Sequence, residues 1–263
     1  MLNEVKDKVK QLLESGEISG FIGLMERNGQ VAPHLFRSVD ELEHLTLGDR
    51  NAPGDARYPL DKILITLTRS YPDQTFGILV RGCDERGLKA LFTWNQVKRK
   101  QVVQVGIACP EELAAKCECI QPYPDEPVAG EKVEGKSFAS VDEVEEMDRE
   151  ERLAYWLKEF DKCVKCYGCR DICPVCFCNE CSLEDRQLVK TYSLPPENPI
   201  FHLTRAVHMA GRCIDCGLCE EACPADIPLR TLYKKVAEIM EEEFDYRTGF
   251  TTESKPPLNV GTP

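Results

Sequence analysis

Residues 163–174 read CVKCYGCRDICP, and residues 213–224 repeat the same cysteine spacing as CIDCGLCEEACP. Each run follows C-x2-C-x2-C-x3-C-P, in which three cysteines bind one 4Fe-4S cluster and the fourth binds the cluster of the other run. The spacing therefore predicts two interlocked clusters. The first is expected on Cys163, Cys166, Cys169 and Cys223, and the second on Cys213, Cys216, Cys219 and Cys173.

Zinc sites and disulfide frameworks also use many cysteines. A zinc ribbon contains paired C-x2-C motifs, but it leaves the third cysteine and the proline of each run without a role. Disulfide frameworks are typical of short secreted chains, whereas this chain has 263 residues. Its first residues read as a charged amphipathic helix, and no stretch is apolar enough for a signal peptide or a membrane span. We therefore expect a cytoplasmic protein of an anaerobe.

Composition and charge indicate a globular protein of two domains. The hydrophobic fraction is 42% and the charged fraction 30%. A net charge of −12 argues against binding of nucleic acid, because phosphate contacts need a basic surface. A proline-, glycine- and charge-rich stretch near the middle suggests a linker. The expected division is an α/β domain over 1–122, a linker over 123–140, a dicluster domain over 141–250 with an insertion at 174–212, and an extended tail over 251–263.

The fold class expected from these patterns is an α/β N-terminal domain followed by an α+β, ferredoxin-like dicluster domain. In the N-terminal half, a hairpin is expected at Asn28 and Gly29. Two short apolar runs, 76–80 and 102–108, flank a helical stretch over 85–94, which predicts a parallel βαβ unit. In the C-terminal half, apolar residues over 141–160 predict one helix that leads into the first cysteine run.

A further four-cysteine site is expected at the edge of the predicted parallel sheet. Cys83 follows the first strand and Cys109 the second, and parallel strands end at the same edge. Cys117 and Cys119 follow in a short loop, and the start of the adjacent helix should favour a thiolate at Cys83. We therefore predict a third 4Fe-4S cluster on Cys83, Cys109, Cys117 and Cys119. Zinc and buried, inert cysteines are the alternatives.

A last group of cysteines, Cys176, Cys178 and Cys181, lies in CPVCFCNEC. Three ligands do not complete a tetrahedral site. The group either binds a metal with a fourth ligand from elsewhere, or is structural, or contacts a partner subunit.

Four stretches carry a resemblance to a known family: 163–181, 201–233, ILVRGCDERGLKAL at 78–91 and GIACPEELAAKCECIQPYPD at 106–125. They resemble the iron-sulfur portion of the beta subunits of deazaflavin-dependent formate dehydrogenases and hydrogenases, and of subunits found with heterodisulfide-reductase-like complexes. This resemblance implies an electron-transfer subunit. It would relay single electrons between a formate dehydrogenase or hydrogenase catalytic subunit and a flavin-bearing heterodisulfide-reductase-like partner.

The family often binds FAD, but this sequence has no G-x-G-x-x-G motif, and Gly16, Gly20 and Gly23 precede a strand. We therefore expect that the clusters are kept and the flavin is lost, and no residues suggest a catalytic site. Two alternatives stay open. One is a flavin-containing oxidoreductase that acts on a deazaflavin or a similar soluble carrier, and the other is a zinc-bearing scaffold.

Overall fold

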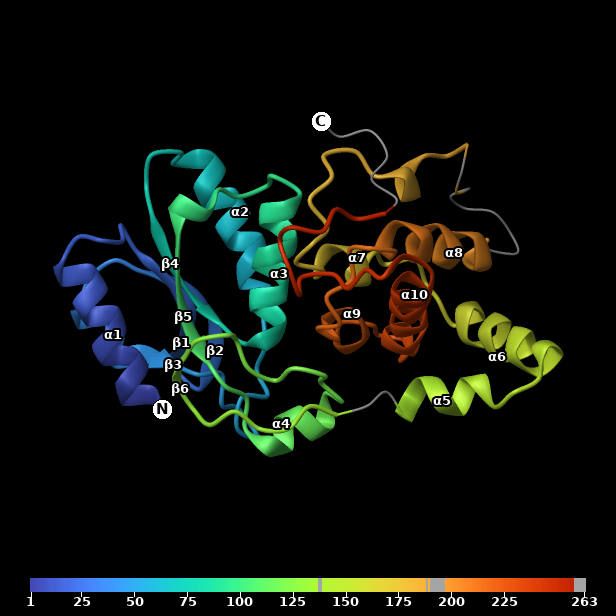
Figure 1. The fold of residues 1–263 in the computed structure, drawn as a ribbon, viewed down its shortest axis with the longest axis horizontal. Helices are drawn as coiled ribbons and strands as arrows, with labels where there is room; N and C mark the ends of the chain where they lie inside the picture. Colours follow the sequence, from blue (N-terminus) through green and yellow to red (C-terminus); the bar gives the residue numbers. More distant parts are fainter. Residues whose placement is uncertain (137–138, 188, 190–196, 258–263) are drawn as a thin grey trace. The chain divides into compact units, whose positions relative to one another are not determined.

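A computed structural model describes residues 1–136, 139–187, 189 and 197–257. The chain divides into two compact units, Met1–Ser137 and Phe138–Pro263, which are described separately (Figure 1). Within the described residues, no helix is both long and apolar enough to cross a membrane.

The first unit is built on a mixed six-stranded sheet. The strand order is β2-β1-β4-β5-β6, and β3 pairs with β1. Strands β1 and β2 form an antiparallel hairpin, whereas β1, β4, β5 and β6 run parallel. The strands are β1 (Phe21–Arg27), β2 (Gln30–Phe36), β3 (Leu45–Thr46), β4 (Phe76–Val80), β5 (Val102–Ile107) and β6 (Pro127–Ala129).

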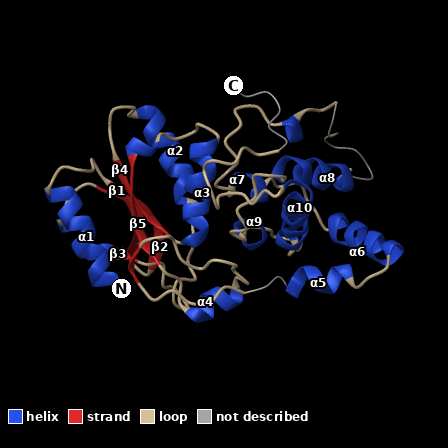
Figure 2. Ribbon diagram, in the orientation of Figure 1, coloured by secondary structure: helices blue, strands red, loops and turns tan. Residues whose placement is uncertain are grey.

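Helices cover both faces of this sheet, as Figure 2 shows. Helix α1 packs on β5 and β6, and α2 and α3 pack on β4. Central strand β4 is buried along its whole length, because helices cover both of its faces. The helical segments of this unit are α1 (Leu2–Glu14), η1 (Asp40–His44), α2 (Leu60–Ser70), α3 (Gly82–Thr93), η2 (Arg99–Gln101) and α4 (Glu111–Lys116).

The local predictions for this unit are confirmed at the hairpin and at the βαβ unit. Asn28 and Gly29 both have positive φ, as the tight turn between β1 and β2 requires. Strands β4 and β5 pair in parallel, with α3 between them in the chain. Strand β6 lies inside the stretch 123–140 that the sequence suggests as a linker. Its pairing with β5 fixes that part of the stretch to the sheet.

The second unit is helical. Helix α6 packs on α8, α10 packs on α5, α8 and α9, and α7 packs on α9. The prediction of a single helix over 141–160 is wrong, because the chain breaks between α5 and α6. Asp148 caps α6 by accepting hydrogen bonds from the backbone N–H groups of Glu150 and Glu151, so it starts a new helix. The segments are α5 (Ala139–Glu145), α6 (Arg149–Asp161), α7 (Gly168–Asp171), η3 (Ser182–Glu184), α8 (Asn198–Met209), α9 (Leu218–Glu221) and α10 (Leu229–Phe244).

The predicted insertion and the predicted tail are only partly described. Residues 188 and 190–196 of the insertion, and 258–263 of the tail, lie outside the described residues. The described part of the insertion holds η3 and α8, and residues 251–257 form no helix or strand.

Candidate iron-sulfur centres

The two cysteine runs of the second unit adopt the same backbone shape. In the first run, Lys165 and Tyr167 have φ of 51° and 61°. At the equivalent places of the second run, Asp215 and Gly217 have φ of 55° and 78°. Each run then enters one short helical turn, α7 or α9. The repeated sequence spacing is therefore a repeated loop in space, with left-handed residues between the cysteines.

This loop shape directs backbone N–H groups toward cysteine sulfur. The N–H of Lys165 donates to Cys163 Sγ at 3.4 Å, and that of Gly168 donates to Cys166 Sγ at 3.5 Å. The backbone of Asp215 makes the corresponding hydrogen bond to Cys213. Such donors stabilise the thiolate form of a sulfur, which is the form that binds iron.

The structure brings together the four cysteines predicted for the first cluster. The thiol of Cys169 lies within electrostatic range of Cys163, Cys166 and Cys223. Helix α7 packs on α9, and this packing brings Cys223 close to the first run. The approach is close at Gly168, where an added Cβ atom would lie 3.2 Å from the carbonyl oxygen of Ala222. The two runs therefore meet through their short helices, although the sequence separates them widely.

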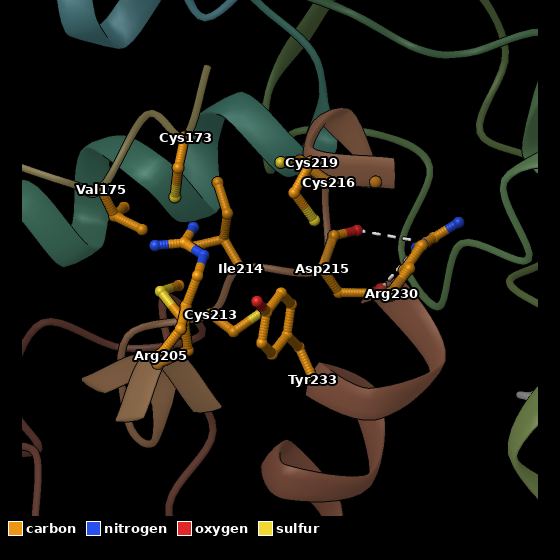
Figure 3. A pocket seen from close by; sticks show the side chains of 12 residues that line it. Cys173, Val175, Arg205, Cys213, Ile214, Asp215, Cys216, Cys219, Arg230 and Tyr233 are labelled. Carbon is orange, nitrogen blue, oxygen red and sulfur yellow. Dashed lines mark hydrogen bonds and ion pairs between the residues drawn. The ribbon is translucent and has the colours of Figure 1, made fainter. Parts of the chain in front are cut away.

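The four cysteines predicted for the second cluster line one cavity of the second unit (Figure 3). Cys173 enters it from the first run, and Cys213, Cys216 and Cys219 enter it from the second. The rest of the wall includes Arg205, Asp215, Arg230 and Tyr233.

The surroundings of these cysteines raise the pKa of three of them. Burial raises the pKa of Cys213 to about 12, and burial also raises the pKa of Cys219 well above its usual value. For Cys173, a hydrogen bond with Cys176 is the first cause of a raised pKa, and burial is the second. These groups are neutral thiols in the metal-free chain, so their conversion to thiolates needs the positive charge of bound metal. Eight thiols in two groups of four fit two 4Fe-4S clusters.

The third cysteine group lies beside arginines. Arg205 Nη1 donates to Cys176 Sγ at 3.4 Å, and Arg212 Nη1 donates to Cys178 Sγ at 3.6 Å. Arg170 hydrogen-bonds to Cys181. The structure therefore places each of the three cysteines next to a different cation.

In the first unit, the edge of the sheet gathers the other predicted cysteines. Cys83 lies in the first turn of α3, and Cys109 follows β5. The thiol of Cys109 interacts electrostatically with the thiols of Cys119 and Cys117. The thiol of Cys83 interacts in the same way with Cys119. Arg86 Nη2 donates to Cys119 Sγ at 3.7 Å.

The loop that carries Cys119 folds back over this edge. Cys109 N–H donates to the carbonyl of Pro122 at 2.8 Å. A Cβ atom at Gly82 would lie 2.2 Å from the carbonyl oxygen of Gln121, so only glycine allows the loop to approach the start of α3 this closely. The convergence of Cys83, Cys109 and Cys119 depends on this contact.

One expectation for this site is wrong. The sequence predicts that the start of α3 favours a thiolate at Cys83, but burial raises the pKa of Cys83 well above its usual value, and neighbouring Asp84 raises it further. Desolvation of the thiolate outweighs the nearby arginines. Asp61 is another buried carboxyl group with a raised pKa. Burial is the main cause, and the negative charge of Asp84 adds to it.

Across the described part of the chain, no three Cys, His, Asp or Glu side chains converge closely enough to hold a single metal ion. A 4Fe-4S cluster makes a different demand, because each thiolate binds a different iron and the four sulfurs stand further apart.

Comparisons with known proteins find an iron-sulfur domain in the second unit. Residues 162–228 match the 4Fe-4S dicluster domain family. The chain is 29% identical over 260 residues to the F420-dependent formate dehydrogenase subunit beta of Methanocaldococcus jannaschii. It is 39% identical over 108 residues to the F420-dependent formate dehydrogenase 1 subunit beta of Methanococcus maripaludis. The chain is similar to these beta subunits, as the resemblance of its motifs predicts.

These alignments differ in how much of each protein they cover. The first includes 97% of this chain and 62% of the relative. The second includes 41% of this chain and 28% of the relative. The chain thus spans less than two thirds of the length of these beta subunits.

Sequence reasoning missed the polar residues that surround the second group of cysteines. Arg205 and Tyr233 lie on α8 and α10, away from the cysteine runs in sequence. The carboxylate of Asp215 binds Arg230 Nε at 2.7 Å, and its side chain is only 13% exposed. A buried helical arginine that contacts no carboxylate has no signature in a sequence pattern.

Proposed function

We propose that this chain is the iron-sulfur electron-transfer subunit of an anaerobic redox complex. The observation that carries the proposal is the arrangement of eight cysteines of the second unit in two groups, each with one member from the other run. When bound, 4Fe-4S clusters accept and donate single electrons. The chain's own residues would hold them: cysteine thiolates would bind iron, and the N–H groups of Lys165 and Gly168 donate to ligand sulfur.

The ligand sets follow the pairing predicted from the sequence. The first cluster is assigned to Cys163, Cys166, Cys169 and Cys223, and the second to Cys213, Cys216, Cys219 and Cys173. A third 4Fe-4S cluster is proposed on Cys83, Cys109, Cys117 and Cys119 in the first unit. A metal-binding role for Cys176, Cys178 and Cys181 stays a prediction, as does the ferredoxin-like character of the dicluster domain.

We propose that this subunit works inside a hetero-oligomeric complex. The named relatives are beta subunits of F420-dependent formate dehydrogenases, so a formate dehydrogenase or hydrogenase catalytic subunit is the first proposed partner. A flavin-bearing heterodisulfide-reductase-like subunit is the second, and cytoplasm is the proposed compartment.

Exposed apolar side chains beside the first cysteine run support a docking role. Val164, between two proposed ligands, is 70% exposed. Helices α6 and α8, which pack on each other, expose further apolar residues. Apolar surface of this kind is typical of protein–protein interfaces. These residues are Leu153, Leu157, Ile200, Leu203 and Val207.

Anaerobic purification followed by iron, sulfide and flavin analysis tests the proposal. Three filled sites give about twelve irons per chain, and two give about eight. Zinc with little iron or acid-labile sulfide would contradict the electron-transfer role and favour a scaffold. Bound flavin with activity toward a soluble carrier would favour a flavin-containing oxidoreductase.

A further inference from the structure

Arg205 is a buried cation whose contacts are with cysteines and an aromatic ring. It is 2% exposed. Its Nη2 donates to the carbonyl of Cys169 at 2.8 Å, its Nη1 donates to Cys176 Sγ at 3.4 Å, and its guanidinium carbon lies 5.7 Å from the ring centre of Tyr233. In the described residues, no carboxylate pairs with it, and its Nε has no hydrogen-bond partner. A buried charge needs a counter-ion.

Tyr233 adds a second buried donor to the same place. The side chain is 1% exposed, and its hydroxyl has no partner within the described part of the chain. A phenol hydroxyl can donate its proton in a hydrogen bond. Arg205 and Tyr233 both line the cavity of the second cysteine group (Figure 3).

Two other arginines near the sites, Arg230 and Arg170, are paired with carboxylates. Arg230 lines the same cavity but binds Asp215 at 2.7 Å. Arg170, next to a ligand of the first site, binds both Asp171 at 2.8 Å and Glu184 at 2.6 Å. Unlike Arg230 and Arg170, Arg205 has no carboxylate partner among the described residues. It lies in the wall of the second site, and its Nη2 also reaches the carbonyl of Cys169, a residue assigned to the first site.

We propose that Arg205 and Tyr233 donate hydrogen bonds to sulfur in the second cluster site and give this cluster a higher reduction potential than the first. The inference rests on the proposed function. An added electron increases the negative charge at the site, so a cation and a hydroxyl donor stabilise the reduced state more than the oxidised state. Low polarity around the buried guanidinium strengthens the effect. Electrons then pass from the first site to the second.

A potentiometric titration monitored by electron paramagnetic resonance tests the inference on the complete, cluster-loaded chain. Cys173→Ser first identifies which signal belongs to the second site. Tyr233→Phe is expected to lower the ratio of reduced to oxidised second cluster about threefold at a fixed potential, a midpoint shift of about −28 mV at 59 mV per tenfold change. Arg205→Met is expected to lower this ratio about tenfold, or about −59 mV, and Arg205→Lys should restore part of the loss.

Two substitutions outside the cavity provide matched controls in the same unit. Tyr246 is a buried tyrosine, and Arg152 is an arginine that binds Glu145 at 2.8 Å. Tyr246→Phe and Arg152→Met should leave both midpoint potentials unchanged.

The outcomes separate the inference from the function on which it rests. A chain that takes up no iron overturns both. A chain that takes up both clusters, but keeps the potential of the second in Tyr233→Phe and Arg205→Lys, overturns the inference alone. Because Tyr233→Phe removes one oxygen that has no partner in the described structure, it decides the matter even where Arg205→Met does not fold.

Discussion

His202 should make the second unit unstable in mild acid. The imidazole is 1% exposed and stacks on Phe160, with ring centres 4.5 Å apart and planes 14° apart. Neither ring nitrogen has a hydrogen-bond partner among the described residues. Burial lowers the pKa of His202 from 6.5 to about 4, with help from the positive charge of Arg205. The folded chain therefore holds this histidine neutral at pH values where the unfolded chain protonates it.

The size of the effect follows from these two pKa values. Between pH 7 and pH 5 the unfolded state binds a proton at His202 and the folded state does not, so the free energy of unfolding falls as the pH falls. With pKa values of 6.5 and about 4, the loss over this interval is about 2 kcal/mol. It approaches its full value only below pH 4, where the folded state is protonated as well.

His202→Phe isolates this contribution, because phenylalanine keeps the ring stacking and cannot be protonated. Urea unfolding of the anaerobic chain, followed by circular dichroism at pH 5, 6 and 7, measures it as a difference between variant and parent. The variant should lose about 2 kcal/mol less than the parent between pH 7 and pH 5. His44→Phe is the control, since that ring is 48% exposed. Equal losses in parent and His202→Phe would refute the reasoning.

Three further predictions concern the clusters and the docking surface. Cys173→Ser should disturb the cluster of the second run more than that of the first, and selective loss of the first signal in electron paramagnetic resonance would overturn the ligand assignment. Cys119→Ala should lower the iron content by about four per chain if the first unit holds a cluster, and an unchanged value would exclude Cys119 as a ligand. If the proposed catalytic partner docks here, Val164→Asp should weaken its binding about tenfold in calorimetry, because an exposed apolar contact is lost. Thr66→Asp on α2 should leave binding unchanged, and an equal loss there would argue against the docking surface.

Local features of this protein could be predicted from its sequence because they depend on neighbouring residues. The turn at Asn28 and Gly29 needs only two residues that tolerate positive φ. The βαβ unit follows from two apolar runs and the helix between them. Repeated cysteine spacing likewise produces repeated loops, since the same residues recur at the same separations.

The break at Asp148 and the pairing of β6 were missed because local patterns competed with other interactions. Apolar periodicity continues through Asp148, but the side-chain cap ends one helix and starts another. Residues 127–129 have the composition of a linker, and the free edge of β5 makes them a strand. Tertiary pairing overrides local preference here.

The sequence by itself determined which cysteines belong to which run and where the parallel strands would carry Cys83 and Cys109. Only the tertiary structure decided what surrounds them. Burial makes Cys83 a neutral thiol despite its helix terminus, and the packing of α8 and α10 brings Arg205 and Tyr233 to the second site. Spacing along the chain determines which cysteines can reach the same metal cluster. The desolvation of a cysteine and the charges near it depend instead on every element that packs around that cysteine.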